Sequence, residues 1–166
     1  MSIRRRVNPM PAAASSLRRW LLRATLTVVF LLVACQFLPV DRRNPAVDPA
    51  KTIYATENVP QAVKAVFMRS CNNCHSNETS WPWYSYVAPV SWLIASDVHH
   101  ARRKMDLSQW GNYTAKKREE NLEDICEQLT DGDMPDGLYA FFHRDAHVSP
   151  QERAAVCQWT EDSRQY

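Results

Sequence analysis

The residues best suited to chemistry are two cysteines and a histidine in the run Cys71-Asn72-Asn73-Cys74-His75. This C-x-x-C-H spacing lets one helical turn present two thiols and an imidazole to a single haem. Each thiol can add to a haem vinyl group as a thioether, while the adjacent imidazole reaches the iron. The run therefore predicts one covalently attached haem c, bound by Cys71 and Cys74, with His75 as an axial ligand of the iron.

A C-x-x-C pair has two other common uses, a structural zinc site and a redox dithiol. Zinc would need two more Cys or His ligands, usually as a second closely spaced pair. Cys126 and Cys157 stand far apart in the chain and form no such pair. A redox C-x-x-C is expected beside a βαβ pattern, whereas the segments that flank Cys71 are helical in pattern. The spacing favours haem.

The second axial ligand is predicted to be Met134. It lies in the helix-breaking run 130–137, and such a loop can hold a thioether over the open face of a haem. A methionine ligand would raise the reduction potential relative to bis-histidine ligation. The other candidates are Met68, which is too near the attachment motif in sequence, and Met105, His99, His100, His143 and His147. Of these, His143 and His147 are the main alternatives.

Four helices are predicted to position these residues. Apolar residues recur at helical spacing over 58–70, 89–104 and 114–130, and a fourth helix begins near Ser149 with a serine cap, a proline and a capping-box glutamate. No stretch alternates as a strand would. The sequence predicts an all-α fold, a compact helical haem domain of the cytochrome c kind that follows an N-terminal transmembrane helix.

An apolar segment precedes this domain. From Ala24 to Val40 the chain carries no charged residue, close to the short limit of a membrane span. Arginines precede the span and few basic residues follow it, which predicts a single-pass anchor in a bacterial inner membrane with the haem domain in the periplasm. Two alternatives stay open: a cleaved secretory signal, and a lipoprotein in which Cys35 of the run Leu32-Val33-Ala34-Cys35 carries the lipid.

These boundaries divide the chain into a cytoplasmic basic segment at 1–19, an anchor at 20–40, a proline-containing linker at 41–57 and a haem-binding domain at 58–166. About 120 residues beyond the anchor leave room for one soluble domain with a modest core. The formal net charge of +2 is too small to indicate a nucleic-acid partner.

Several residues around the motif have two possible uses. The aromatic residues near the motif could wall the haem edge or simply fill the core: Trp81, Trp83, Tyr84, Tyr86 and Trp92. The basic helix end Arg102-Arg103-Lys104 could pair with haem propionates, or it could be solvated. A carbonyl near Pro82 or Pro89 could accept the His75 ring N–H. Cys126 and Cys157 could form a disulfide or remain thiols.

The chain resembles a known family, the small haem-binding domain proteins related to class I cytochromes c. The similarity is carried by 36–37, 43–45, the run 71–85 with its Trp81-Pro82-Trp83-Tyr84 segment, 88–92, 107–110, Met134-Pro135, Tyr139, His143, Ala146, 148–149 and Trp159. It implies a monohaem domain with a membrane anchor and supports Met134-Pro135 as the distal loop. Two departures, at His100-Ala101 and Asp106, affect one local loop.

The expected function is single-electron transfer by a membrane-anchored monohaem cytochrome, whose redox partner the sequence does not name. The principal alternative is a peroxide- or gas-reactive enzyme or sensor, in which Met134 leaves the iron and His143 or His147 assists proton transfer. A third possibility is a haem accessory subunit of a larger oxidoreductase.

Overall fold

The computed structural model describes residues 12–164, and within that range every regular element is a helix and no strand is found. The predicted all-α class is therefore confirmed. Part of the predicted basic segment 1–19, including Arg4, Arg5 and Arg6, lies outside the described residues. The main helices are α1 (Ala12–Cys35), α2 (Ile53–Thr56), α3 (Gln61–Val66), α4 (Asn72–His75), α5 (Val90–Lys104), α6 (Ala115–Asp131), α7 (Gly137–Phe142) and α8 (Pro150–Arg164).

Shorter turns connect these helices. Four are 3-10 turns: η1 (Pro49–Lys51), η3 (Trp83–Tyr86), η4 (Leu107–Asn112) and η5 (Arg144–Ala146). The fifth, η2 (Phe67–Cys71), is a π-helical turn that joins α3 to α4, so the chain coils without a break into the C-x-x-C-H motif. Single π turns inside helices are frequent at functional sites.

The four predicted helices are all present, and their ends follow local chemistry. Thr114 caps α6 by accepting a hydrogen bond from the Lys117 N–H at 3.2 Å, and Gly132 ends it with a left-handed φ of 80°. The predicted capping box of α8 also forms. The Ser149 N–H donates to Glu152 at 2.8 Å, and the Glu152 N–H donates to the Ser149 hydroxyl at 3.3 Å.

One hydrophobic core unites α2, α3, η2, η4, α6 and α8. Its buried members are Ile53, Val63, Val66, Phe67, Leu107, Trp110, Leu122, Ile125, Leu129, Val156 and Trp159. Phe67 packs edge-on against Trp159, with ring centroids 5.5 Å apart. Because Phe67 lies four residues before Cys71, the core fixes the helical turn that presents the first thiol.

Cys126 of α6 and Cys157 of α8 are joined by a disulfide whose Cα atoms are 4.8 Å apart. The sequence left open whether these two cysteines form a disulfide or remain thiols, and the structure shows the disulfide. The closed loop contains Met134 and α7, so the bridge limits how far this segment can move from the core.

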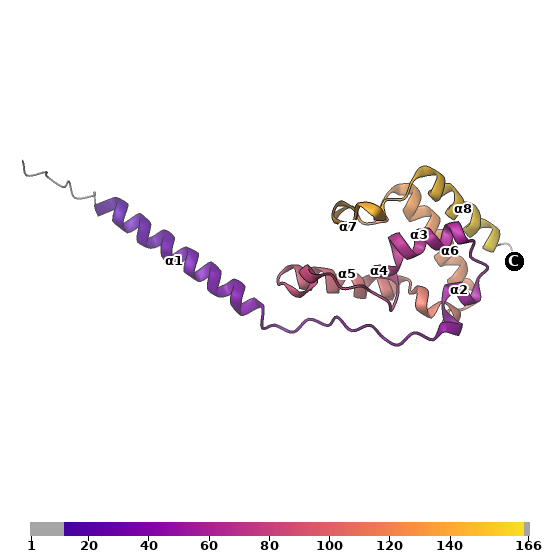
Figure 1. Ribbon diagram of the computed structural model, residues 1–166, viewed down its shortest axis with the longest axis horizontal. Coiled ribbons are helices and arrows are strands. Elements are labelled where there is room, and N and C mark those ends of the chain that lie inside the picture. The colour runs from indigo at the N-terminus through magenta and orange to yellow at the C-terminus, as the bar shows by residue number, and fades with distance from the viewer. Residues whose placement is uncertain (1–11, 165–166) are drawn as a thin grey trace, which may run out of the picture.

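The helix α1 stands apart from the rest of the fold (Figure 1). Its large apolar side chains are exposed, including Trp20 and Phe30. Within residues 12–164, no helix is both long enough and apolar enough to cross a membrane, so the predicted transmembrane helix is not found there. Arg18, Arg19 and Arg23 lie in the first half of α1, and the helix ends at Cys35 rather than near residue 40.

The segment that follows α1 is attached to the domain rather than free. The side chain of Gln36 pairs with both backbone polar groups of Ala88, accepting from its N–H at 3.0 Å and donating to its carbonyl at 3.1 Å. The His99 ring lies 3.0 Å from the Asp41 carbonyl. We call residues 36–45 the strap. The prolines suggested a mobile linker, but side-chain hydrogen bonds hold this stretch against α5 and η3.

The folded unit also begins before the predicted boundary at residue 58. Ile53 is completely buried in the core, and the Trp110 indole N–H donates to Glu57 at 2.8 Å. A Cβ on Gly111 would lie 3.2 Å from the Lys51 Cα, so glycine permits the close approach of η4 to η1. A four-residue helix offers too few apolar positions to show a helical period, which is why the sequence pattern hid α2.

Candidate haem-attachment site

His75 is oriented by a backbone carbonyl. Its Nδ1 lies 3.0 Å from the carbonyl oxygen of Met105, the residue that caps α5. Donation from Nδ1 to this carbonyl leaves Nε2 with its lone pair available for a metal. Burial lowers the pKa of His75 below its ordinary value, although the hydrogen bond to Met105 opposes the shift. The neutral imidazole that iron requires is therefore favoured. The sequence had placed the accepting carbonyl near Pro82 or Pro89, and this was wrong.

The two motif thiols are free and partly buried. Burial raises the pKa of Cys71 to about 12 and that of Cys74 to about 11. Asp97 and Asp136 add to the increase at Cys74, whereas Arg102 opposes it. Both side chains are therefore protonated thiols at neutral pH.

This electrostatic setting bears on the two alternative uses of the motif. Zinc ligands and redox nucleophiles are thiolates, which positive surroundings favour. Here the raised pKa values of Cys71 and Cys74 work against the thiolate. In the part of the chain that the structure describes, no group of three or more His, Cys, Asp or Glu residues could hold a metal ion. The donor set lacks the further ligands of a zinc site.

Asn73, between the two cysteines, holds the motif by three hydrogen bonds. Its carbonyl accepts from the Thr79 hydroxyl at 2.7 Å, and its side-chain oxygen accepts from the Ser80 N–H at 3.1 Å. Its amide donates to the Tyr139 hydroxyl at 2.9 Å. Tyr139 belongs to α7, so the motif is tied to the helix that follows the Met134 loop.

Met134 lies in the loop between α6 and α7, as predicted. The Met134 backbone N–H donates to the Gln128 carbonyl at 3.1 Å, and Met134 is 41% exposed. Two residues further on, Asp136 caps α7 by accepting from the N–H groups of Leu138 and Tyr139. Asp136 is close enough to Cys74 to raise the pKa of the thiol. The structure thus brings the Met134 loop to the neighbourhood of the motif.

The alternative distal ligands are otherwise engaged or exposed. The Nε2 of His143 lies 2.6 Å from the Tyr84 hydroxyl, and the His143 ring stacks on Tyr139 with centroids 4.3 Å apart. His147 is exposed at the end of η5. His143 therefore joins α7 to η3, the turn that follows the C-x-x-C-H segment.

Exposed apolar side chains collect on the elements around the motif, which is the fit expected for a large flat apolar ligand. They come from η3, the start of α5, the Met134 loop and α7: Trp83, Tyr86, Val87, Val90, Leu93, Met134, Leu138, Phe141 and Phe142. On α5, Val98 and Ala101 are buried, whereas Val90 and Leu93 near the start of the helix are exposed. In Figure 1, α7 and the beginning of α5 project from the same side of the domain. The residues present fit a haem held by the motif between these elements.

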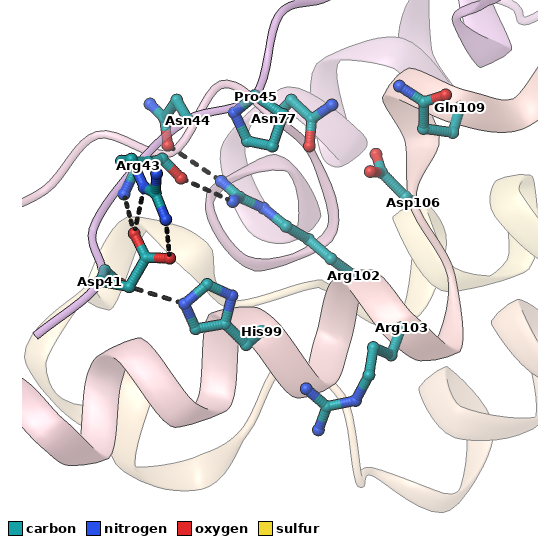
Figure 2. Close-up of a pocket in the computed structure, with 10 residues that line it drawn as sticks. All are labelled: Asp41, Arg43, Asn44, Pro45, Asn77, His99, Arg102, Arg103, Asp106 and Gln109. Atoms are coloured by element: carbon teal, nitrogen blue, oxygen red, sulfur yellow. Dashed lines mark hydrogen bonds and ion pairs between the residues drawn. The ribbon is translucent and has the colours of Figure 1, made fainter.

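The aromatic residues after the motif are not core residues. All five are at least partly exposed. Trp81 donates to Asn44 at 3.1 Å, and Arg42 lies 4.4 Å above the Tyr86 ring. Of the basic helix end, Arg102 is directed at the strap and the loop after the motif, as Figure 2 shows. The Arg103 guanidinium lies 3.5 Å from the His100 ring, on the same helix.

Sequence reasoning missed the hydrogen-bonding roles of Asn73 and Asn44, and it considered Met105 as an axial ligand rather than as the carbonyl that orients His75. The carbonyl of Met105 has no sequence signature, because any residue at the end of α5 could supply it. Asn73 and Asn44 had a signal: both fall in the segments that carried the family resemblance, where polar residues within a short motif indicate hydrogen-bonding roles.

A family model described as a haem-binding domain matches residues 30–162. This match covers the end of α1, the strap and nearly all of the helical domain, including every residue of the candidate site. No curated protein matches the chain, and no solved structure matches it. The motif geometry, the apolar surroundings and the family match agree, and the chain belongs to the haem-binding domain family.

Proposed function

We propose that this protein is a membrane-anchored, periplasmic monohaem c-type cytochrome that transfers single electrons. The observation that carries the proposal is the His75–Met105 hydrogen bond of 3.0 Å, which engages Nδ1 and leaves Nε2 available, in a motif whose two thiols are free. A bound haem supplies a one-electron iron couple, and the protein sets its ligation, burial and access.

Each residue has a separate role in this proposal. Cys71 and Cys74 hold the haem through thioether bonds, and the His75 Nε2 binds one axial position. Met134 supplies the thioether sulfur at the other position, from a loop whose backbone is fixed by Gln128 and by the cap of α7. The disulfide between α6 and α8 restrains this loop on both sides.

The membrane attachment is supported by α1 alone. Its exposed apolar side chains between Arg23 and Cys35, with Arg18, Arg19 and Arg23 on their N-terminal side, suit a segment that inserts into a bilayer with the arginines toward the cytoplasm. Alkaline extraction of membranes tests this part: the full chain should remain in the membrane pellet. Cys35→Ser should not release it if the helix anchors the chain, whereas release would favour lipidation of Cys35. A wild-type chain found in the supernatant would contradict both forms of anchoring.

The function is tested by the visible and near-infrared spectrum of the full chain in its haem-loaded, oxidised form. His/Met ligation gives a methionine-to-ferric-iron charge-transfer band. We expect this band in the wild type and in Met68→Ala, and its loss in Met134→Ala. Met68 is a suitable control because it is exposed near the motif and its sulfur accepts a hydrogen bond from Asn72 at 3.2 Å.

The same preparation separates electron transfer from the rival function. After reduction with dithionite, a carrier with two axial ligands should bind carbon monoxide slowly in the wild type and rapidly in Met134→Ala. Rapid binding of carbon monoxide by the wild type, or turnover of peroxide, would instead support a reactive haem with an open position. A charge-transfer band that persists in Met134→Ala would remove Met134 from the ligand set.

A further inference from the structure

One arginine of α5, Arg102, contacts both the strap and the loop that follows the C-x-x-C-H motif. In Figure 2 the Arg102 side chain extends from the helix toward Arg43 and Asn44, on the wall of an open pocket. Its Nη1 donates to the Arg43 carbonyl at 3.1 Å, and one Nη2 hydrogen bond reaches the Asn44 side-chain oxygen at 2.9 Å. Asn44 also donates to the Thr79 carbonyl at 2.8 Å. Arg102 and Asn44 together fix the strap in place.

The other side of the same guanidinium contacts the loop after the motif. The Nε of Arg102 donates to the Ser76 carbonyl at 2.7 Å, and Nη2 donates to the Thr79 hydroxyl at 2.8 Å. Ser76 is the residue directly after His75. A planar guanidinium offers five N–H donors in a fixed geometry, which a lysine ammonium cannot reproduce.

These bonds continue into the C-x-x-C-H motif. Thr79, which accepts from Arg102, donates its own hydroxyl proton to the Asn73 carbonyl at 2.7 Å. Asn73 in turn donates to Tyr139 of α7 at 2.9 Å. A chain of hydrogen bonds therefore runs from Asn44 through Arg102, Thr79 and Asn73 to Tyr139.

We propose that Arg102 is a positioning residue for the haem, through which the strap becomes part of the haem site. The inference rests on the proposed haem attachment and adds a residue to it. Arg102 holds the loop that directly follows His75 against α5, through Ser76 and Thr79, and its fixed positive charge lies near the motif. A positive charge there disfavours the oxidised iron, which carries one more positive charge than the reduced iron, so it raises the reduction potential.

The experiment uses the haem-loaded full chain and compares Arg102→Gln, Arg102→Lys and Arg103→Gln. Arg103 is the matched control, because it is adjacent in α5, carries the same charge, and its side chain pairs with His100 rather than with the strap or the loop after the motif. The reduction potential and the circular dichroism of the Soret band are measured for each. We expect Arg102→Gln to lower the potential and alter the Soret dichroism. Arg102→Lys should restore most of the potential but not the dichroism, because it keeps the charge and loses the planar donor arrangement.

A solely structural role would give a different result. If Arg102→Gln lowers the unfolding temperature but keeps the potential and Soret dichroism of the wild type and of Arg103→Gln, the proposal is overturned. Should Arg102→Gln fail to fold, Asn44→Ala decides. This substitution removes one hydrogen-bond partner from each of Arg102, Thr79 and Trp81 without changing the charge, and an unaltered Soret dichroism would equally overturn the proposal.

A haem-free measurement separates this inference from the proposed function. If the wild type carries no covalent haem, the c-type proposal fails, but amide hydrogen exchange over residues 73–80 still tests the role of Arg102. We expect faster exchange there in Arg102→Gln and Asn44→Ala than in the wild type and Arg103→Gln. Equal exchange in all four chains would show that Arg102 does not hold the loop.

Discussion

The Nδ1 of His75 lies 3.0 Å from the carbonyl oxygen of Met105, thirty residues further along the chain. This bond joins the end of α4 to the end of α5, where the Met105 N–H also donates to the Ala101 carbonyl at 2.9 Å. The imidazole is therefore held before any ligand arrives, and its Nε2 is the nitrogen left for iron. A preorganised ligand loses little freedom on binding.

The first prediction concerns the imidazole. His75→Ala should still attach haem through Cys71 and Cys74, but its iron should lose the wild-type spectrum, because one axial ligand is gone. Added imidazole should restore a six-coordinate spectrum by occupying the vacated position. His147→Ala serves as the control, since His147 is exposed and its bond to Arg69 is made by its backbone carbonyl, which alanine keeps. A wild-type spectrum in His75→Ala would contradict the assignment.

The second prediction concerns the thiols. Cys71→Ala and Cys74→Ala should each retain haem through one thioether, and the double variant should lose it on denaturation. The pyridine haemochrome spectrum checks this, because its maximum depends on how many vinyl groups remain unsaturated. Cys35→Ser, which changes the third free cysteine, should match the wild type. Haem that stays bound to the denatured double variant would show that attachment does not use these cysteines.

The third prediction concerns the bond between Cys126 and Cys157. The closed loop spans a sequence separation of 31, for which loop-closure entropy gives a stabilisation of about 3–4 kcal/mol. Replacing both cysteines by alanine should lower the free energy of unfolding by about that amount, measured by urea denaturation. In the denatured haem-free chain, three of five cysteines should react with a thiol reagent before reduction and all five afterwards. Five reactive thiols without reductant would contradict the bridge.

The long helices could be predicted from the sequence because apolar residues recur in them at helical spacing and because capping residues mark where two of them begin. The predicted boundary at 114 has a threonine cap, and that at 149 has a serine cap with a capping-box glutamate. The short elements could not be predicted. The six residues of α7 make less than two helical turns, which is too short for an apolar period to show.

The sequence indicated the candidate site residues themselves, but not the hydrogen-bond partners that position them. Spacing alone indicated Cys71, Cys74 and His75, and helix-breaking residues indicated the Met134 loop. The role proposed for Arg102 was not readable from the sequence, because a basic helix end is normally solvated. The fold places the carbonyls of Arg43 in the strap and of Ser76 after the motif within its reach. Prolines predicted a linker over 41–57, but its first residues are bound to the domain as part of the strap and its later residues form η1 and α2.

The last prediction concerns pH and the pair formed by Glu152 and Arg69. Glu152 accepts from the Arg69 guanidinium at 2.9 Å and from the Ser149 N–H at 2.8 Å. These hydrogen bonds, chiefly that of Arg69, lower the pKa of Glu152 to about 2 from an ordinary value of 4.5. The unfolded chain therefore takes up the proton at a higher pH than the folded chain does. The stabilisation is complete above pH 4.5 and is lost as the pH falls toward 2.

Its size is limited, because both side chains are about one-third exposed: 31% for Arg69 and 33% for Glu152. Solvent screening reduces such a pair to about 1 kcal/mol. Glu152→Gln should lower the free energy of urea unfolding at pH 7, and its difference from the wild type should shrink as the pH falls below 4.5. Glu123→Gln is the control, because Glu123 is 60% exposed in its pair with Arg164 and should show a smaller difference. If the difference in unfolding free energy between Glu152→Gln and the wild type stayed constant from pH 7 to pH 2, the Glu152 carboxylate would not be stabilised by Arg69 of η2.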